Sequence, residues 1–244
     1  MDGDCSSTEF AVGAPSGVAG ARFWERYARV YDRIWDSPLT DAVNRRLWTN
    51  LPAAGQAVDL GCGTGLSSGP LRRLGWSVTG IDQSPAMLDQ AVEHGRITTA
   101  LCRDAATTGL PSGRADLVLV SNLLHLAAEP VAVLDEAWRL LAPAGLLAVV
   151  WPASGATLGT ALRADLRAGR AFGPSLAAAF DRLGVGLAGA RVGARAHSGA
   201  AVADVVDAWA AARGAVTLHA GSVFDVECYL VVTKPGNPAP DWVA

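Results

Sequence analysis

Short apolar runs alternate with helical stretches through the middle of the chain, and this alternation limits the possible folds more than any other feature. The apolar runs predict strands at residues 57–60, 77–81, 98–102, 117–120 and 146–151. The stretches between them predict helices at residues 66–74, 84–94 and 131–141. Strands and helices that alternate at this spacing indicate a parallel sheet with helices on both faces, the α/β class.

A long uncharged window raises the alternative of a membrane span. No residue between Arg139 and Arg163 carries a formal charge, and 50% of the chain is hydrophobic. A spanning helix needs about 20 consecutive apolar residues, but Pro143, Gly145 and Pro152 interrupt this window. A buried strand flanked by turns is favoured, because parallel strands covered on both faces are continuously apolar. We therefore expect no membrane association.

Further elements flank the alternating region. The spacing of apolar residues predicts one helix over residues 22–35 and a second over 39–50. A cap insertion is expected over about 152–213, with helices at 157–169, 174–183 and 203–213. Two strands at 215–219 and 227–233 would then pair across a turn at 220–226. Residues 22–236 are expected to form a single domain, between a disordered tail at 1–21 and a second tail at 237–244.

The charge balance and the cysteines argue against several classes of function. The formal net charge is −3 and no basic block occurs, so nucleic-acid binding has little electrostatic support. The cysteines are scattered with no CxxC pair, and we expect no metal site. Residues 1–20 lack the basic and apolar segments of a secretory signal, which predicts a cytoplasmic protein. The sequence does not indicate an oligomeric state.

A glycine-rich segment carries the chemistry. Residues 58–65 read VDLGCGTG, directly after the first predicted strand and before a predicted helix. Glycines let the backbone turn tightly and approach a ligand closely, and a helix N-terminus offers unpaired N–H groups to an anionic group. Asp82 ends the second predicted strand, at a distance from Gly61 that suits an acceptor for both hydroxyls of a ribose. The two features together predict a site for a nucleoside-containing cofactor.

The glycine spacing and Asp59 distinguish between possible cofactors. The dinucleotide pattern is GxGxxG, and here Gly61 and Gly63 fit, but the third position is Leu66 and the extra glycine is Gly65. The carboxylate of Asp59 would repel a pyrophosphate in a poorly solvated site. The cationic ammonium and sulfonium groups of S-adenosylmethionine (SAM) would tolerate or favour that carboxylate. The local chemistry therefore prefers SAM to NAD.

Between Tyr27 and Trp151 the chain resembles the class I SAM-dependent methyltransferases, in particular the small-molecule branch often called methyltransferase type 11. The resemblance rests on five blocks in the family's order, which are VDLGCGTG, VTGIDQSPAML, CRDAATTGLP, ADLVLVSNLLHL and EAWRLLAPAGLLAVV. It implies a methyltransferase that uses SAM and releases S-adenosylhomocysteine (SAH). It also implies a Rossmann-like, doubly wound, mostly parallel sheet of seven strands with an antiparallel last strand, in which residues 215–219 and 227–233 are strands six and seven.

The same resemblance implies roles for individual residues. The positions expected to bind SAM are Tyr27, Tyr31, Asp59, Gly61, Cys62, Gly63, Asp82, Gln83, Met87, Asp104, Ala105 and Ser121. The acid and backbone of the glycine segment, with Ser121, would hold the methionine part, and Asp82 would bind the ribose. Gln83 and Met87 would flank the adenine, whose amino group would meet Asp104 beside the N–H of Ala105. The tyrosines belong to the family's N-terminal helix, which closes over the methionine end.

Several positions keep a plainer alternative. Tyr27 and Tyr31 lie on the apolar face of a predicted helix, so simple packing is an equal alternative for them. Asp104 is either the adenine contact or a solvated loop acid. His125 follows the fourth predicted strand and is the candidate catalytic residue, as a base or as a group that orients the substrate.

The methyl acceptor is the part of the function that the sequence defines least. Candidate walls of its pocket are Trp24, Trp35, Trp151 and Phe172, and the alanine-rich cap favours an uncharged small molecule such as a secondary metabolite. The sequence does not distinguish N-, O-, S- and C-acceptors. Two other functions stay open. One is a SAM-binding enzyme of the same fold with a non-methylating reaction such as a cyclisation, and the other is a nucleotide-binding oxidoreductase or regulatory module.

Overall fold

The computed structural model describes residues 18–48, 51, 54–156, 158–171, 173–174, 176–178, 180–181, 183 and 197–235. The tails predicted at 1–21 and 237–244 lie outside these residues, except that 18–21 belong to the first helix. No helix in the described ranges is both long enough and apolar enough to cross a membrane.

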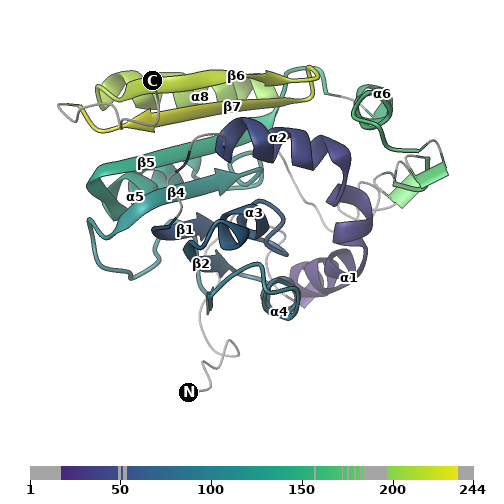
Figure 1. Ribbon diagram of the computed structural model, residues 1–244, viewed down its shortest axis with the longest axis horizontal. Coiled ribbons are helices and arrows are strands. Elements are labelled where there is room, and N and C mark those ends of the chain that lie inside the picture. The colour runs from purple at the N-terminus through teal and green to yellow at the C-terminus, as the bar shows by residue number, and fades with distance from the viewer. Residues whose placement is uncertain are drawn as a thin grey trace.

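A seven-stranded sheet forms the centre of the molecule, as predicted (Figure 1). Its strands are β1 (Gln56–Leu60), β2 (Ser77–Asp82), β3 (Thr99–Cys102), β4 (Ala115–Ser121), β5 (Leu141–Pro152), β6 (Val216–Val223) and β7 (Glu227–Thr233). Their order across the sheet is β3-β2-β1-β4-β5-β7-β6. The first five strands pair in parallel, and β7 is antiparallel to both of its neighbours. The prediction of a mostly parallel sheet with an antiparallel last strand is therefore confirmed.

Helices cover both faces of the sheet because successive strand residues point to opposite sides. The helices are α1 (Val18–Trp35), α2 (Pro38–Trp48), α3 (Ser68–Arg73), α4 (Pro85–Glu93), α5 (Pro130–Leu140), α6 (Leu158–Arg167) and α8 (Gly199–Ala212). On β4, Leu117 and Leu119 join the core cluster that contains residues of α2, α3 and α4. Val118 and Val120 join the cluster on the other face, under α5 and α8. This alternation produces the doubly wound architecture.

The uncharged window is part of the sheet, but its turn differs from the prediction. The strand β5 already begins at Leu141 and includes the Pro-Ala-Gly segment at 143–145. Its pairing with β4 jumps from Ala115↔Leu141 to Leu117↔Leu146, so the segment bulges out of the ladder. Gly145 is required there, since a Cβ would lie 2.7 Å from the carbonyl oxygen of Ala115.

The predicted cap also differs at its C-terminal end. Residues 199–212 were expected to belong to it, but they form α8, which packs on the sheet through Val202, Val206 and Trp209. The Nε1 atom of Trp209 donates to Asp135 Oδ1 on α5 at 2.7 Å, and this bond ties the two helices together. The part of the predicted cap that is inserted after β5 and does not pack on the sheet as α8 is thus the region between β5 and α8, where α6 lies. The sequence predicts no clear element for the glycine-rich stretch 183–190, of which only Leu183 is among the described residues.

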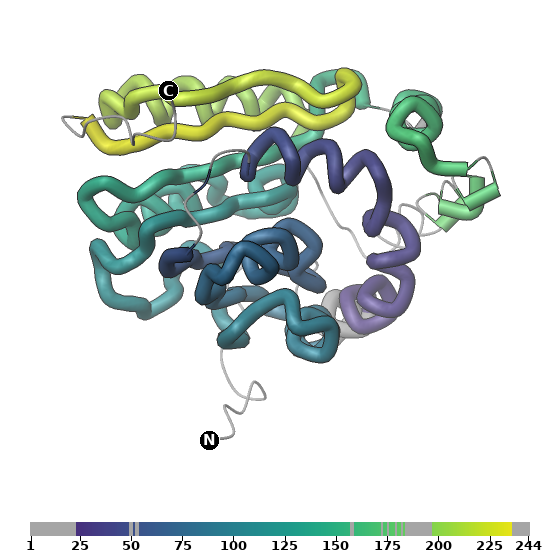
Figure 2. The backbone as a smooth tube through the Cα atoms, in the orientation of Figure 1, coloured from purple at the N-terminus to yellow at the C-terminus, as the bar shows by residue number. Residues whose placement is uncertain are grey.

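The order of the strands creates a switch point between β1 and β4. The chain leaves β1 toward β2 and β3, then returns to the other side of β1 with β4. In such sheets ligands bind in the crevice outside the carboxyl ends of the strands at this point. Figure 2 shows α1 and α6 on the side toward which the parallel strands run, with α2 crossing one face of the sheet.

Candidate functional site

A cavity of about 900 Å³ lies at the switch point between β1 and β4. Every residue that the sequence predicted to bind SAM lines it, and so does the candidate catalytic residue His125. The walls are supplied by the ends of β1, β2 and β4, by α1 and by the segment after β5. The structure thus brings all the predicted site residues together, while their individual roles stay predictions.

The glycine segment turns directly out of β1 in left-handed backbone conformations. Gly61 has φ +68° and Gly63 has φ +52°, values that residues with a side chain rarely adopt. At Gly61 a Cβ would lie 2.7 Å from a methyl carbon of Leu123. At Gly63 a Cβ would lie 3.6 Å from the hydroxyl of Tyr31, inside the cavity. Gly61 therefore makes room for the side chain of Leu123, and Gly63 keeps its backbone open toward the cavity beneath Tyr31.

Asp82 anchors this loop at the end of β2. Its Oδ2 accepts a hydrogen bond from the N–H of Gly63 and its Oδ1 accepts one from the N–H of Ser84, each at 2.9 Å. Burial raises the pKa of the carboxyl, and the bonds from the backbone oppose that rise. Each carboxylate oxygen retains acceptor capacity, because an ionised carboxyl has about four lone-pair positions. Asp82 can thus accept bonds from two further hydroxyl groups.

Asp59 is a buried carboxyl on β1 with one unused oxygen. Its Oδ2 accepts a bond from Ser68 Oγ at 2.6 Å, while Oδ1 is enclosed and has no hydrogen-bond partner. Burial raises the pKa of Asp59 to about 7, and the charge of Asp82 acts in the same direction against the bond from Ser68. A cationic group in the cavity would stabilise the ionised form.

The residues predicted for the adenine form a second polar corner. Gln83 Nε2 donates to Asp104 Oδ2 at 2.7 Å, and the N–H of Ala106 donates to Asp104 Oδ1 at the same distance. These contacts show that Asp104 is held within the site, which argues against a solvated loop acid. Met87 is almost fully buried and supplies an apolar surface beside them.

An aromatic stripe on α1 faces the cavity. Trp24, Tyr27, Tyr31 and Trp35 recur at helical spacing, and all four line the cavity. Trp35 Nε1 donates to the hydroxyl of Tyr27 at 2.6 Å, and the rings of Tyr27 and Tyr31 meet edge to face at 5.2 Å. Burial raises the pKa of Tyr31 well above its usual value, so its phenol stays neutral. The two tyrosines therefore pack against neighbouring rings and also line the cavity, so the packing interpretation does not exclude the predicted ligand contact.

The end of β4, the segment after it and Ser67 add further polar groups to the lining of the cavity. Ser121 Oγ and Ser67 Oγ lie within hydrogen-bonding distance, at 3.2 Å. His125 Nδ1 is enclosed without a hydrogen-bond partner, and burial lowers the pKa of the imidazole to about 4, with the charge of His197 acting in the same direction. A neutral imidazole with so low a pKa is a weak base. The unpartnered Nδ1 is free to form a hydrogen bond with a ligand, and the role of His125 stays a prediction.

Asn122 was not predicted from the sequence but belongs to the same wall. Its backbone has φ +53°, its N–H donates to the carbonyl of Val150 at 2.9 Å, and its Oδ1 is buried without a partner. Asparagine is among the few residues with a side chain that adopt this conformation at modest cost. An Asn two positions after an apolar run was the available signal, since strained residues cluster at functional sites.

Some of the residues predicted to form the acceptor pocket line the cavity and one does not. Trp24 and Trp35 line the cavity, whereas Trp151 is buried in the sheet core and does not line it. Phe172 lies outside the described residues. Within the described ranges no group of three or more His, Cys, Asp or Glu side chains is placed to hold a metal ion.

The site fits SAM better than a dinucleotide. The unpartnered oxygen of Asp59 suits a cationic ammonium group, whereas the neighbouring carboxyls of Asp59 and Asp82 would repel a pyrophosphate. Asp82 presents acceptors for ribose hydroxyls, and the cradle at Gly63 leaves the backbone accessible. When bound, SAM supplies a methyl group already activated by its sulfonium.

Comparison with known proteins agrees with this fit. Residues 58–149 match the family described as Methyltransferase domain. Trans-aconitate 2-methyltransferase of Methylobacterium radiotolerans is 32% identical over 201 residues, covering 80% of this chain and 75% of the relative. Malonyl-[acyl-carrier protein] O-methyltransferase of Alcanivorax borkumensis is 33% identical over 163 residues, covering 61% of this chain and 54% of the relative. This chain thus spans about half the length of the second relative.

A solved structure shares the fold at low sequence identity. It is the N-methyltransferase NodS of Bradyrhizobium japonicum, determined with SAH, with a TM-score of 0.59 and 16% identity. The match covers 88% of this chain and 98% of that one. The fold, the fitted cavity and the relatives lead to one conclusion: the chain belongs to the class I SAM-dependent methyltransferases, with SAM as its cofactor.

Proposed function

We propose that this enzyme transfers the methyl group of SAM to an uncharged small molecule held between α1, the segment after β4 and the residues that follow β5. The observation that carries the proposal is the lining of the cavity beyond the carboxyls of Asp59 and Asp82. That lining is mostly aromatic and aliphatic, and its neutral polar groups include Asn122 and His125. Its charged side chains beyond Asp59 and Asp82 are Arg103, Asp104, Glu129 and Glu227. Cavities of this kind bind small molecules and orient them by a few polar groups.

The proposed roles of the chain's residues are binding, alignment and exclusion of water. Asp59 would hold the methionine ammonium and Asp82 the ribose hydroxyls. The aromatic stripe of α1 would close the methionine end, which keeps water from the reacting centre. Alignment alone lowers a barrier by up to about 7–11 kcal/mol in well-oriented intramolecular reactions. His125 and Asn122 would orient the acceptor, and a strong base is not required of the protein.

The relatives support methyl transfer from SAM, but their names do not support an uncharged acceptor. The name of the first relative specifies trans-aconitate, and that of the second specifies an acyl-carrier protein. The alanine-rich sequence after β5 supports an uncharged acceptor instead, and it extends the proposal to secondary metabolism. The absence of a basic block in the sequence supports the exclusion of nucleic acid from the acceptors. The cytoplasmic location stays a prediction from the sequence.

An acceptor screen with isotopically labelled SAM tests the proposal. The panel should contain uncharged phenols, alcohols, amides and thiols beside matched carboxylic acids, trans-aconitate among them. We expect label and one CH2 unit of added mass in uncharged compounds, because most of the described lining is apolar and its carboxyls would repel a carboxylate acceptor. Label only in the carboxylic acids would contradict the uncharged acceptor. Turnover of a substrate that rearranges without added mass would instead support the non-methylating alternative.

The protonation state of His125 gives a prediction that needs no acceptor. Because burial lowers its pKa to about 4, the imidazole should stay neutral from about pH 8 to 5 and gain its proton only below that range. NMR of labelled histidines would follow this titration, with His125→Asn identifying the signal. A midpoint near the ordinary value for histidine would restore His125 as a candidate base.

A further inference from the structure

The helix α1 carries the aromatic stripe but has little apolar anchorage of its own. Among its described side chains, Ala28 and Ile34 are the hydrophobic ones that are fully buried. The four side chains of the aromatic stripe instead line the cavity. The position of the stripe over the glycine segment must therefore depend strongly on other contacts of α1.

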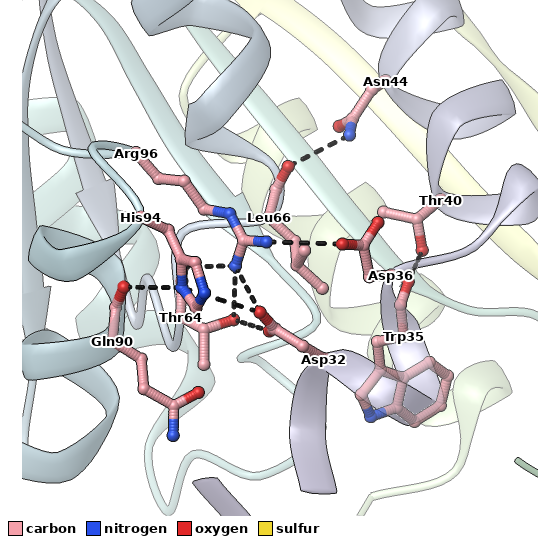
Figure 3. Close-up of polar contacts among 10 residues, drawn as sticks. All are labelled: Asp32, Trp35, Asp36, Thr40, Asn44, Thr64, Leu66, Gln90, His94 and Arg96. Carbon is pink, nitrogen blue, oxygen red and sulfur yellow. Dashed lines mark hydrogen bonds and ion pairs between the residues drawn. The ribbon is translucent and has the colours of Figure 1, made fainter. Parts of the chain in front are cut away.

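A polar cluster joins α1 to the glycine segment beside the aromatic stripe (Figure 3). Thr64, which lies inside that segment and is fully buried, donates from Oγ1 to Asp32 Oδ1 at 2.6 Å. Arg96, in the connection between α4 and β3, donates from one guanidinium nitrogen to Asp32 Oδ2 at 2.7 Å and to the carbonyl of Thr64 at 3.1 Å. Its other terminal nitrogen reaches Asp36, directly after the end of α1, at 3.4 Å. We call Asp32, Thr64 and Arg96 the latch.

Arg96 is built into the fold and is not a surface ion pair. Its side chain is 15% exposed. Its stem lies against Gly65 and Gly69, where a Cβ would come within 2.9 Å and 3.3 Å of Arg96 carbons. Gly69 lies within the short helix α3, and glycine there costs about 1 kcal/mol relative to alanine. The two glycines therefore keep a passage open for the arginine to reach α1.

The latch and the cavity meet on adjacent residues. Tyr31 faces Gly63 on the cavity side, while the next residue along the helix, Asp32, bonds Thr64, the next residue along the loop. A shift of Asp32 away from Thr64 would thus carry Tyr31 away from Gly63. The same C-terminal end of α1 has a second support, because Arg170 donates to the carbonyls of Arg33 and Ile34.

We propose that Arg96 is a positioning residue for the cofactor: its ion pair with Asp32 holds α1 against the glycine segment, so that the aromatic stripe retains SAM and SAH in the cavity. This inference rests on the proposed cofactor site. It predicts that the latch sets the rate at which the cofactor leaves, because the aromatic stripe must separate from the loop before the methionine end is released. The latch residues need not contact the cofactor themselves.

The test measures SAH dissociation in stopped-flow competition experiments with three variants. Arg96→Gln keeps much of the stem and removes the charge, Asp32→Asn keeps an acceptor for Thr64 and removes the charge, and the third variant combines both. Each single variant should release SAH roughly tenfold faster, the effect of losing a partly buried charge-assisted hydrogen bond. The double variant should be no faster than the singles, since both remove the same contact. Arg96→Lys should restore part of the slow release.

A matched control separates positioning from general stability. Arg213→Gln removes a 2.6 Å ion pair to Asp135 between α8 and α5, on the opposite face of the sheet, and should leave SAH release unchanged. Hydrogen exchange should become faster in α1 of the latch variants but not in the strands. Unchanged SAH release in both single variants would overturn the role of the latch but not the cofactor site. Faster hydrogen exchange spread equally over α1 and the sheet would have the same consequence. Failure of the unsubstituted protein to bind SAH would overturn the cofactor site as well. If Arg96→Gln does not fold, the near-isosteric Asp32→Asn decides the matter.

Discussion

Replacing Asp82 by alanine should raise the dissociation constant for SAH by roughly 100- to 10,000-fold, the effect of losing two hydrogen bonds to a charged acceptor. The carboxyl lies in the cavity at the end of β2, where each oxygen already accepts one backbone bond. Alanine removes the acceptors for the ribose and releases the N–H of Gly63 as well. Isothermal titration calorimetry with SAH measures the change directly.

Two further variants make the Asp82 result specific. Asp82→Asn keeps an oxygen acceptor but removes the charge, so its loss of affinity should lie between those of the alanine variant and the unsubstituted protein. Asp116→Ala is the matched control, because Asp116 also accepts a backbone bond, from the N–H of Gln56 at 2.8 Å, at the opposite end of β1. Its SAH affinity should not change. Equal affinity in Asp82→Ala and the unsubstituted protein would show that the ribose assignment is wrong.

The parts of the site that could be read from the sequence are those that local backbone chemistry determines. The glycine segment and Asp82 follow directly after predicted strands, and parallel neighbours bring the ends of β1 and β2 together. The pairing of Leu60 with Ile81 places the acid beside the glycines without any knowledge of distant contacts. Their position was therefore predictable from the alternation of strands and helices alone.

The parts that were missed depend on contacts between distant segments. Arg96 and Asp32 are 64 residues apart, and nothing in the local pattern of either one indicates the other. The helix α8 was assigned to the cap because its apolar stripe fits any apolar surface, and only the fold shows that this surface is the sheet. The requirement for glycine at position 145 was missed for a similar reason, since the close approach of Gly145 to Ala115 arises from the pairing of β5 with β4.

The affinity for SAH should also depend on pH through Asp59. Burial raises the pKa of this carboxyl to about 7 in the folded protein, while the ammonium group of the ligand favours the ionised form. Below about pH 7 binding must therefore expel a proton, and the affinity should rise by up to tenfold per pH unit from about pH 5 to 7 and then level off. Calorimetry in buffers of different ionisation enthalpy should show about one proton released per SAH bound near pH 6.

The stability of the ligand-free protein should change in the opposite direction. A carboxyl whose pKa is raised by folding contributes stability only while it is protonated in both states, below its ordinary value of 3.8. That contribution is lost as the pH rises from there to about 7, because the unfolded chain then ionises more readily than the folded one. The rise in melting temperature caused by SAH should consequently be larger at pH 8 than at pH 5.5, approximately in step with the affinity.

The variant Asp59→Asn identifies the group responsible for this proton. Asparagine has nearly the same shape and can still accept the bond from Ser68 Oγ, but it does not titrate. Its SAH affinity should be lower than that of the unsubstituted protein above pH 7 and nearly independent of pH. Burial also raises the pKa of Asp82, the other carboxyl that faces Asp59 in the cavity. A slope that survives in Asp59→Asn would therefore assign the proton to Asp82 and remove Asp59 from the ammonium site.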